Sequence, residues 1–267
     1  MKKFIIAIAA GLSLVACTKV IDVNLNSADP QIVIEAELVA GEPNFSVKIS
    51  KTADYFGTDQ PVPVENAAVL LARENDAPVS LNHAGAGIYN LSDLFATENT
   101  TYHLTVNVDG KTYEATSFLP KKVDLDSLTY EVAEEPPFGG LPVDSFQVNC
   151  FFKDPADAVN YYRLRSTVNS VPRREGDKLL VIDDRLVQGN NINIPIFTDS
   201  FEKNDTVQVE LVSLDKAGFD YFNTLTLIIS SNGGGSAAPA NPVSNWSGGA
   251  LGHFGAVSIS RKTVVLQ

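Results

Sequence analysis

The chain has 267 residues, with 32 acidic and 20 basic side chains, and its formal net charge is −12. A surface this acidic repels polyanions, so neither nucleic acid nor an anionic lipid head group is expected as a partner. The sequence contains only two cysteines, Cys17 and Cys150. A disulfide framework is therefore excluded as the main source of stability, and packing of an apolar core must supply it.

An export signal opens the chain. Lys2 and Lys3 form a short positive segment, and an unbroken run of apolar or small residues follows at 4–15. This order is typical of a secretory signal peptide. At about 1.5 Å per helical residue the run reaches roughly 18 Å, against a hydrocarbon core of about 30 Å. The segment is therefore too short to span a bilayer.

The end of this segment, Leu14-Val15-Ala16-Cys17, resembles the lipobox of bacterial lipoproteins. The resemblance implies that the Cys17 thiol receives a diacylglycerol, that residues 1–16 are removed as a lipoprotein signal peptide, and that residues 17–29 form a lipidated tether. Two or more acyl chains are enough for stable anchoring. The alternative is an ordinary signal peptide followed by a chance cysteine. We expect a protein that is attached to a membrane through Cys17 without spanning it.

Residues 30–120 alternate apolar and polar side chains, which indicates β-strands. The clearest pair is 102–108 and 111–118, because the intervening Asp109-Gly110 suits the tight primed turn of a hairpin. Short strands with regular turn signals predict an antiparallel β-sandwich over this range. Further strand patterns lie at 31–39, 45–49 and 67–71.

The first sandwich also resembles a known type. Gly87-Ile-Tyr89 and Tyr102-His-Leu-Thr-Val106 are similar to motifs of prealbumin-like or carboxypeptidase-regulatory sandwiches, and an Ig-like sandwich fits them as well. The resemblance implies that these tyrosines lie in the core. It also implies a domain that serves for packing or display rather than for catalysis.

Residues 121–267 predict a second β-rich domain with one α-helix and long loops. Asp215 can cap the helix, since Phe219, Phe222 and later apolar residues follow at three-to-four spacing. Glycine, serine and proline in 230–242 predict a loop. Together the two halves predict a mainly β fold, with two antiparallel β-sandwich domains. Strand patterns cover 125–132, 146–152, 160–168, 178–182 and 206–214, and 254–260 with 262–266 fits a closing strand pair.

No residue pattern predicts a metal site or a cofactor. The three histidines, His83, His103 and His253, lie far apart, and none has a carboxylate or a second histidine at ligand spacing. Cys150 lies in an alternating strand pattern, so we expect a buried and unreactive thiol. We therefore expect neither a bound metal nor a cofactor.

Catalytic motifs are also missing from the sequence. No serine stands in G-x-S-x-G. Residues 233–238 fit G-x-G-x-x-A, but Pro239 prevents the helix that a dinucleotide site requires. The adjacent acids Asp183 and Asp184 are expected to be solvated. A catalytic set assembled from distant residues is left open by these patterns, and so is a glycosidase-like pair of acids.

The segment 241–256 has the strongest claim to a binding function. It holds the only tryptophan, Trp246, among glycines that let a ligand approach the backbone. We therefore predict Asn245, Trp246, His253 and Phe254 as binding residues. The alternative is that Trp246 and Phe254 fold back and plug the open end of the second sandwich.

The order of features along the chain resembles one family, the Bacteroidota lipoproteins that share domain of unknown function 4249 and are encoded beside TonB-dependent outer-membrane receptors. The resemblance implies an outer-membrane setting and a TonB-dependent receptor as partner, but it supplies no catalytic residues. It depends on the lipobox at Cys17, Asp22-Val-Asn-Leu, Pro30-Gln-Ile-Val-Ile-Glu-Ala, Gly87-x-Tyr89, Tyr113-x-Ala115, Tyr161-Tyr-Arg163 and residues 248–256.

We accordingly predict a lipoprotein of the outer membrane, on its periplasmic face or at the cell surface. We expect a non-enzymatic accessory of a TonB-dependent transporter, which captures substrate or caps the receptor. Two alternatives stay open. One is an envelope hydrolase acting on glycan or peptide, and it needs Asp183, Asp184 and Glu210, or a Ser/His/Asp set, to converge in one cleft. The other is a purely structural or adhesive surface module.

Overall fold

The computed structural model describes residues 29–53, 60–132, 145–173, 179–196, 200–231 and 240–267. In this part the chain is mainly β with one α-helix, which confirms the predicted fold class. Within the described ranges, no helix combines the length and apolarity that a membrane crossing requires. Cys17 and the glycine-rich segment 233–238 lie outside the described residues.

The first half of the chain forms a sandwich around one apolar core. Strands β5, β4, β8 and β9 make a four-stranded sheet, and β1, β2, β7 and β6 face it. The predicted hairpin is confirmed, since Asp109 and Gly110 both have positive φ, 53° and 75°. The strands are β1 (Ile32–Val39), β2 (Phe45–Lys51), β3 (Val62–Pro63), β4 (Ala68–Arg73), β5 (Val79–Ser80), β6 (Asn82–Gly85), β7 (Ile88–Leu91), β8 (Thr100–Val108) and β9 (Lys111–Leu119).

The second half encloses a separate apolar core. A three-stranded sheet of β10, β11 and β15 lies on one side, and β12, β14 and β16 lie on the other. The helix begins directly after Asp215, as predicted. The elements are β10 (Leu125–Val132), β11 (Phe146–Lys153), β12 (Tyr161–Val168), β13 (Val171–Arg173), β14 (Leu180–Asp183), β15 (Asn191–Pro195), β16 (Thr206–Leu214), α2 (Lys216–Ser231), the 3-10 turn η4 (Ser247–Gly249) and β17 (Leu251–Val265).

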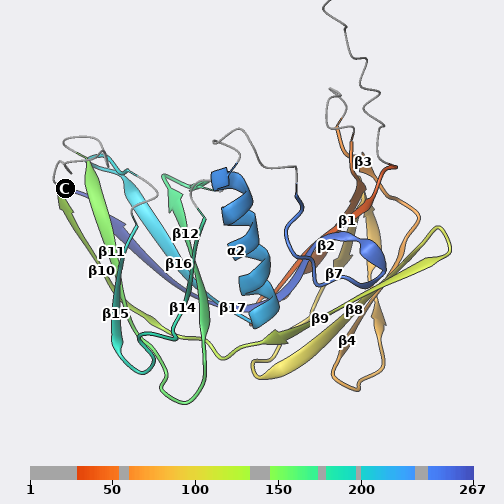
Figure 1. Ribbon diagram of the computed structural model, residues 1–267, viewed down its shortest axis with the longest axis horizontal. Coiled ribbons are helices and arrows are strands. Elements are labelled where there is room, and N and C mark those ends of the chain that lie inside the picture. Colours follow the sequence, from red (N-terminus) through yellow and green to blue (C-terminus); the bar gives the residue numbers. More distant parts are fainter. Residues whose placement is uncertain (1–28, 54–59, 133–144, 174–178, 197–199, 232–239) are drawn as a thin grey trace, which may run out of the picture.

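Strand β17 joins the two halves. Its residues 251–257 pair in parallel with β1, and residues 258–265 pair antiparallel with β16, so one ten-stranded sheet runs through both sandwiches. Figure 1 shows β17 passing behind α2 from one sandwich to the other. The predicted closing pair of two short strands is wrong, because Arg261 continues the same strand. The sheet is also mixed rather than purely antiparallel.

The path of β17 changes the predicted division of the chain at residue 120. Phe254 and Ala256 belong to the core of the first sandwich, although they lie in the range assigned to the second. On the opposite face of the strand, Val257 packs with Phe222 of α2. Residues 252–258 are therefore buried on both faces of the sheet. Such two-sided burial occurs where a helix covers the outer face of a sandwich.

The parallel pairing of β1 with β17 requires a glycine at one position. Gly252 has a φ of +88°, and an added Cβ would lie 2.2 Å from the carbonyl oxygen of Ile34. A side chain at this position clashes with the backbone of the neighbouring strand, which has no room to move within a paired sheet.

Replacing Gly252 with alanine should therefore destabilise the protein by more than about 3 kcal/mol, because a rigid clash adds to the penalty of a left-handed backbone. Gly249→Ala is the matched control, since Gly249 has a φ of +79° but nothing within 4 Å of an added Cβ. It should lose only about 1–2 kcal/mol. Urea unfolding of both variants measures the difference, and equal losses would contradict the proposed clash.

Candidate binding sites between the two sandwiches

The structure places two of the predicted binding residues in the core of the first sandwich. Trp246 is 6% exposed and its Nε1 donates to the carbonyl oxygen of Ile34 at 3.1 Å, while Phe254 is fully buried. The prediction that they form a contact surface is therefore wrong. They plug a sandwich, as the alternative held, but it is the first one and not the second, because β17 pairs with β1.

Asn245 has a structural position as well. Its Oδ1 accepts from the backbone N–H of Phe254 at 3.1 Å, and its Nδ2 donates to the carbonyl oxygen of Phe254 at 2.8 Å. The same Nδ2 lies 3.3 Å from the carbonyl oxygen of Thr116 on β9. Close by, Ser247 Oγ accepts from the N–H of Glu114 at 2.9 Å. These side chains cover the open edge of β9, which otherwise exposes unpaired backbone groups.

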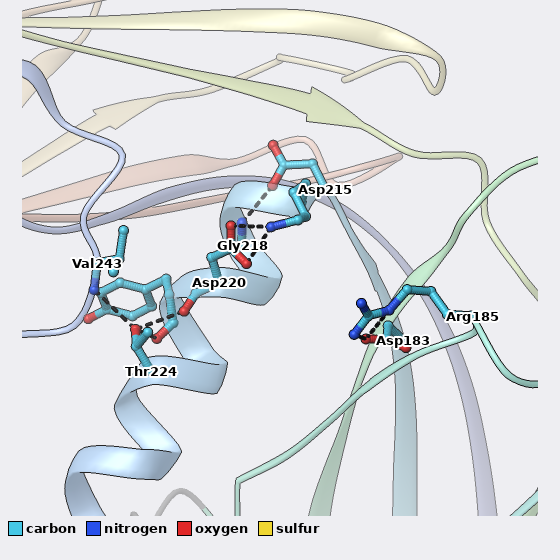
Figure 2. Close-up of polar contacts among 9 residues, drawn as sticks. Asp183, Arg185, Asp215, Gly218, Asp220, Thr224 and Val243 are labelled. Atoms are coloured by element: carbon cyan, nitrogen blue, oxygen red, sulfur yellow. Dashed lines mark hydrogen bonds and ion pairs between the residues drawn. The ribbon is translucent and has the colours of Figure 1, made fainter.

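Asp215 connects α2 to the first sandwich. One carboxylate oxygen accepts from the N–H of Gly218 at 2.7 Å and caps the helix, as Figure 2 shows. The other oxygen accepts from Ser117 Oγ at 2.7 Å and from the N–H of Phe118 at 3.0 Å. Ser117 Oγ in turn accepts from the N–H of Ala256 on β17 at 2.8 Å. The Asp215 carboxylate therefore holds α2 against the edge strand β9, and Ser117 extends this contact to β17.

A large cavity lies beside this contact, and we call it the seam cleft. It has a volume of about 1010 Å³ and is bounded by the end of β9, the link from β9 to β10, the end of β11 and the first turn of α2. Exposed apolar side chains of Phe118 and Val159 line it. Ser213 also lines it; this side chain is 3% exposed, and its Oγ has no hydrogen-bond partner among the residues that the structure describes.

The charges of the seam cleft are balanced although the chain is strongly acidic. Lys122 pairs with Asp124 at 2.9 Å, whereas Lys121 and Lys153 form no ion pair with a described residue. A cleft with both charges and exposed apolar surface suits a polar, neutral or zwitterionic ligand better than a highly charged one. The charged residues that line it are Lys121, Lys122, Lys153, Lys216, Asp124, Asp126, Asp157 and Asp215.

A second cavity, which we call the helix pocket, lies between α2 and the outer face of β1, β2 and β17. Its volume is about 360 Å³, and His253 lines it. The His253 ring stacks on Tyr221 with centroids 5.0 Å apart and an interplanar angle of 22°. Of the four predicted binding residues, His253 lines this pocket.

Burial lowers the pKa of His253 to about 4. The negative charge of Asp215 opposes this change, and the positive charge of Arg163 adds to it. Tyr221 and Phe222, which also face the ring, are uncharged near neutral pH. The imidazole is therefore neutral at pH 7, where it offers one hydrogen-bond donor and one acceptor.

The three acids named above for a hydrolase, Asp183, Asp184 and Glu210, line neither the seam cleft nor the helix pocket. Asp183 pairs with Arg185 at 2.6 Å, as Figure 2 shows, and buried Asp184 accepts from the N–H of Asn160 at 2.7 Å. Glu210 lies between Arg165 at 2.8 Å and Arg261 at 2.7 Å. Burial opposes ionisation of Glu210, but the two guanidinium groups hold its pKa below the ordinary value.

The remaining candidates from the sequence lie in structural positions. His83 packs against the Tyr89 ring at 5.0 Å, and His103 Nδ1 is 3.0 Å from Thr116 Oγ1. Cys150 is fully buried, which confirms that part of the prediction, and burial raises the pKa of its thiol to about 12. The described ranges hold no group of three metal-binding side chains.

With the geometry established, comparison with known proteins gives one result. The family model of the domain of unknown function DUF4249 matches residues 18–263. The chain belongs to the DUF4249 family. Among proteins with curated descriptions, none matches it. Family membership therefore leaves the activity of the seam cleft and of the helix pocket unassigned.

Sequence reasoning missed Ser213 and Tyr221. Ser213 interrupts the apolar run Leu211-Val212-Ser213-Leu214, and a hydroxyl in a strand buried on both faces was the available signal. Tyr221 lies one position before Phe222 in the helical pattern, so its contact with His253 depends on tertiary packing.

The pKa of His253 predicts a pH dependence of stability. The unfolded chain takes up a proton near pH 6.5, whereas the folded protein does so only near pH 4. This contribution to stability is complete above pH 6.5 and is lost as the pH falls toward 4, by up to about 3 kcal/mol. His253→Gln, which does not titrate, should lack this loss. Urea unfolding from pH 4 to 7 measures the difference, and parallel pH profiles would refute it.

Asp215→Ala should lower the free energy of unfolding by about 2–4 kcal/mol, because it removes a helix cap and leaves donors on Ser117 and Phe118 without an acceptor. Asp220→Ala is the control on the same helix, since the Asp220 carboxylate pairs with the exposed Lys216 and with no other side chain among the described residues. That variant should unfold nearly as the wild type does. A small loss for Asp215→Ala in chemical denaturation would show that the carboxylate does not join helix and sandwich.

Proposed function

We propose that this DUF4249 protein is a non-enzymatic lipoprotein of the outer membrane, anchored through Cys17, that acts with a TonB-dependent receptor and captures its substrate in the seam cleft. The observation that carries this proposal is the cleft itself, a cavity of about 1010 Å³ assembled from both sandwiches. The lipobox-like end of the signal segment supports the anchor.

The cleft suits capture because its two walls are held in a fixed relation. β17 is hydrogen-bonded to β1 in the first sandwich and to β16 in the second, and Asp215 adds polar contacts beside the cleft. A preformed site loses little conformational entropy on binding. The volume is at the upper end of the range for small-molecule sites, about 300–1,000 Å³. It is large enough for a ligand of several sugar or amino-acid units.

The three acids that the sequence offers to a hydrolase support binding rather than hydrolysis, since none of them lines the seam cleft. Asp183 and Glu210 are each neutralised by arginine, and Asp184 is used to hold the backbone at Asn160. A glycoside hydrolase needs two carboxyl groups facing one cleft, with one pKa raised for proton donation. Here the pKa values of Asp183 and Glu210 are lowered instead.

Co-purification tests the partner. The tagged full-length protein, extracted from membranes in mild detergent, should carry a stoichiometric β-barrel receptor that mass spectrometry identifies. Cys17→Ser is the control, because it removes the acylated thiol and should release the protein from the membrane fraction. Recovery of the lipoprotein alone would refute the receptor partnership, and it would favour an enzyme or a structural surface module.

The capture function has a separate test in cells. Val159 lines the cleft and is 49% exposed, so Val159→Trp should fill part of the cavity with little effect on folding. Loss of about 1.4 kcal/mol of binding weakens capture about tenfold, so growth on the nutrient that requires this gene should slow when that nutrient is limiting. Val171→Trp, at a 59% exposed position on β13, is the matched control. Equal growth of the two variants would argue against capture in the cleft.

A further inference from the structure

Two carboxylates in the second sandwich are buried without a basic residue of the described chain beside them. Asp154 and Asp184 are each 1% exposed, and neither forms an ion pair with a basic residue that the structure describes. A buried charge is costly to the fold unless it is paired or bound to a metal ion. These two side chains therefore need a cation that the described chain itself does not supply.

One oxygen of Asp184 also has no hydrogen-bond partner among the described residues. Its Oδ2 accepts from the backbone N–H of Asn160 at 2.7 Å and from Asn160 Nδ2 at 3.1 Å. Its Oδ1 is buried and accepts from no described group. Native proteins retain few such atoms, and a bound ion is one of the reasons for keeping them. An ionised carboxylate only accepts, so the partner of Oδ1 has to be a donor or a cation.

Four oxygens meet around the side-chain nitrogen of Asn160. Two of them belong to the buried carboxylates and two to backbone carbonyl groups. They lie from Nδ2 at 2.9 Å (Ala158 O), 3.1 Å (Asp184 Oδ2), 3.4 Å (Pro155 O) and 3.5 Å (Asp154 Oδ1). All are hard oxygen donors of the kind that Ca²⁺ binds in proteins. The two oxygens of one carboxylate lie side by side, so the free Oδ1 of Asp184 is next to this meeting point.

Tyr162 gives separate evidence that the two acids are close neighbours. Its hydroxyl donates to Asp154 Oδ1 at 2.5 Å. Burial raises the pKa of Tyr162, and the hydrogen bond to Asp154 and the negative charges of Asp154 and Asp184 add to this change. The same hydroxyl therefore lies within the electrostatic reach of both carboxylates. Two like charges in one buried site disfavour each other, which a bound cation would relieve.

Backbone hydrogen bonds fix the two segments that supply these groups to each other. The N–H of Gly189 donates to Asp154 Oδ2 at 2.8 Å, and the N–H of Asp154 donates to the carbonyl oxygen of Asn190 at 3.0 Å. The N–H of Asp184 donates to the carbonyl oxygen of Asn160 at 3.2 Å. A set of ligands that is already in place loses little conformational entropy on binding.

We propose that the segment 154–160 binds a calcium ion together with Asp184. The ligands are the two carboxylates and the carbonyl oxygens of Pro155 and Ala158, and the Asn160 amide turns so that Oδ1 rather than Nδ2 faces the ion. Calcium takes about six to eight oxygens, including carbonyl groups and waters. Two carboxylates therefore suffice, although no three metal-binding side chains converge in the described ranges. Residues 157–160 also line the seam cleft, so the ion would fix one of its walls whether or not a receptor is the partner.

Thermal unfolding of the full-length protein in a neutral detergent tests the site. With an affinity of about 0.1–1 mM, as in extracellular calcium modules, calcium chloride at about 10 mM should raise Tm by at least about 3 °C. Magnesium chloride at the same concentration controls for charge screening, because Mg²⁺ keeps several of its own waters and fits a buried cage poorly. No rise with calcium, or an equal rise with both salts, would overturn the proposal.

Two substitutions of equal charge locate the effect. Asp184→Asn should abolish the rise in Tm with calcium, since it removes the charge of a ligand. Asp183→Asn is the matched control, because it removes the same charge from the neighbouring residue, which pairs with Arg185, and it should keep the rise. A rise that persists in Asp184→Asn would show that calcium acts elsewhere and would overturn the site.

Asn160→Asp keeps the test decisive if Asp184→Asn fails to fold. A third carboxylate at the meeting point should lower Tm without calcium, because it adds an uncompensated buried charge, and it should enlarge the rise that calcium produces. A loss of stability in Asn160→Asp that calcium does not repair would contradict a cation at this position.

Discussion

The pairing of β17 with strands from both halves is the constraint on which the rest of the structure depends. The first half of this strand completes the sheet of one sandwich in parallel with β1, and the second half completes the other in antiparallel with β16. The two cores therefore share one ladder of backbone hydrogen bonds, in addition to the chain segment between β9 and β10 that links them. The helix pocket borders β17 directly, and the seam cleft lies at the start of α2, next to the end of β16.

Polar contacts strengthen the same junction. Asp215 binds the backbone of β9, and Arg165 on β12 pairs with Glu37 on β1 at 2.8 Å while it also contacts Glu210. Burial opposes the charge of Arg165, but Glu37 and Glu210 raise its pKa, so the group stays charged. Removing one member of such a partly buried network leaves the others without compensation. The two sandwiches thus behave as one body around two fixed cavities.

This rigidity bears on function. A protein that transfers a ligand to a membrane receptor benefits from a preformed site, and the seam cleft is a cavity of about 1010 Å³ lined by residues of both sandwiches. The helix pocket differs in size and lining, and its buried histidine is neutral at pH 7. The match to the DUF4249 family model extends over residues 18–263, so it includes the residues that line both cavities. Each cavity can therefore be tested separately by variants that leave the other intact.

The sequence by itself determined the strands, the Asp109-Gly110 hairpin, the helix after Asp215 and the buried state of Cys150. These features depend on local periodicity and turn chemistry, which neighbouring residues fix. Only the tertiary structure decided which sandwich receives the end of the chain, and therefore that Trp246 and Phe254 are core residues while His253 faces a pocket. β1 lies near the start of the described sequence and β17 at its end. No local sequence pattern specifies a strand pairing between residues so far apart in the chain. A one-residue change of register would also have exchanged the faces of Phe254 and His253.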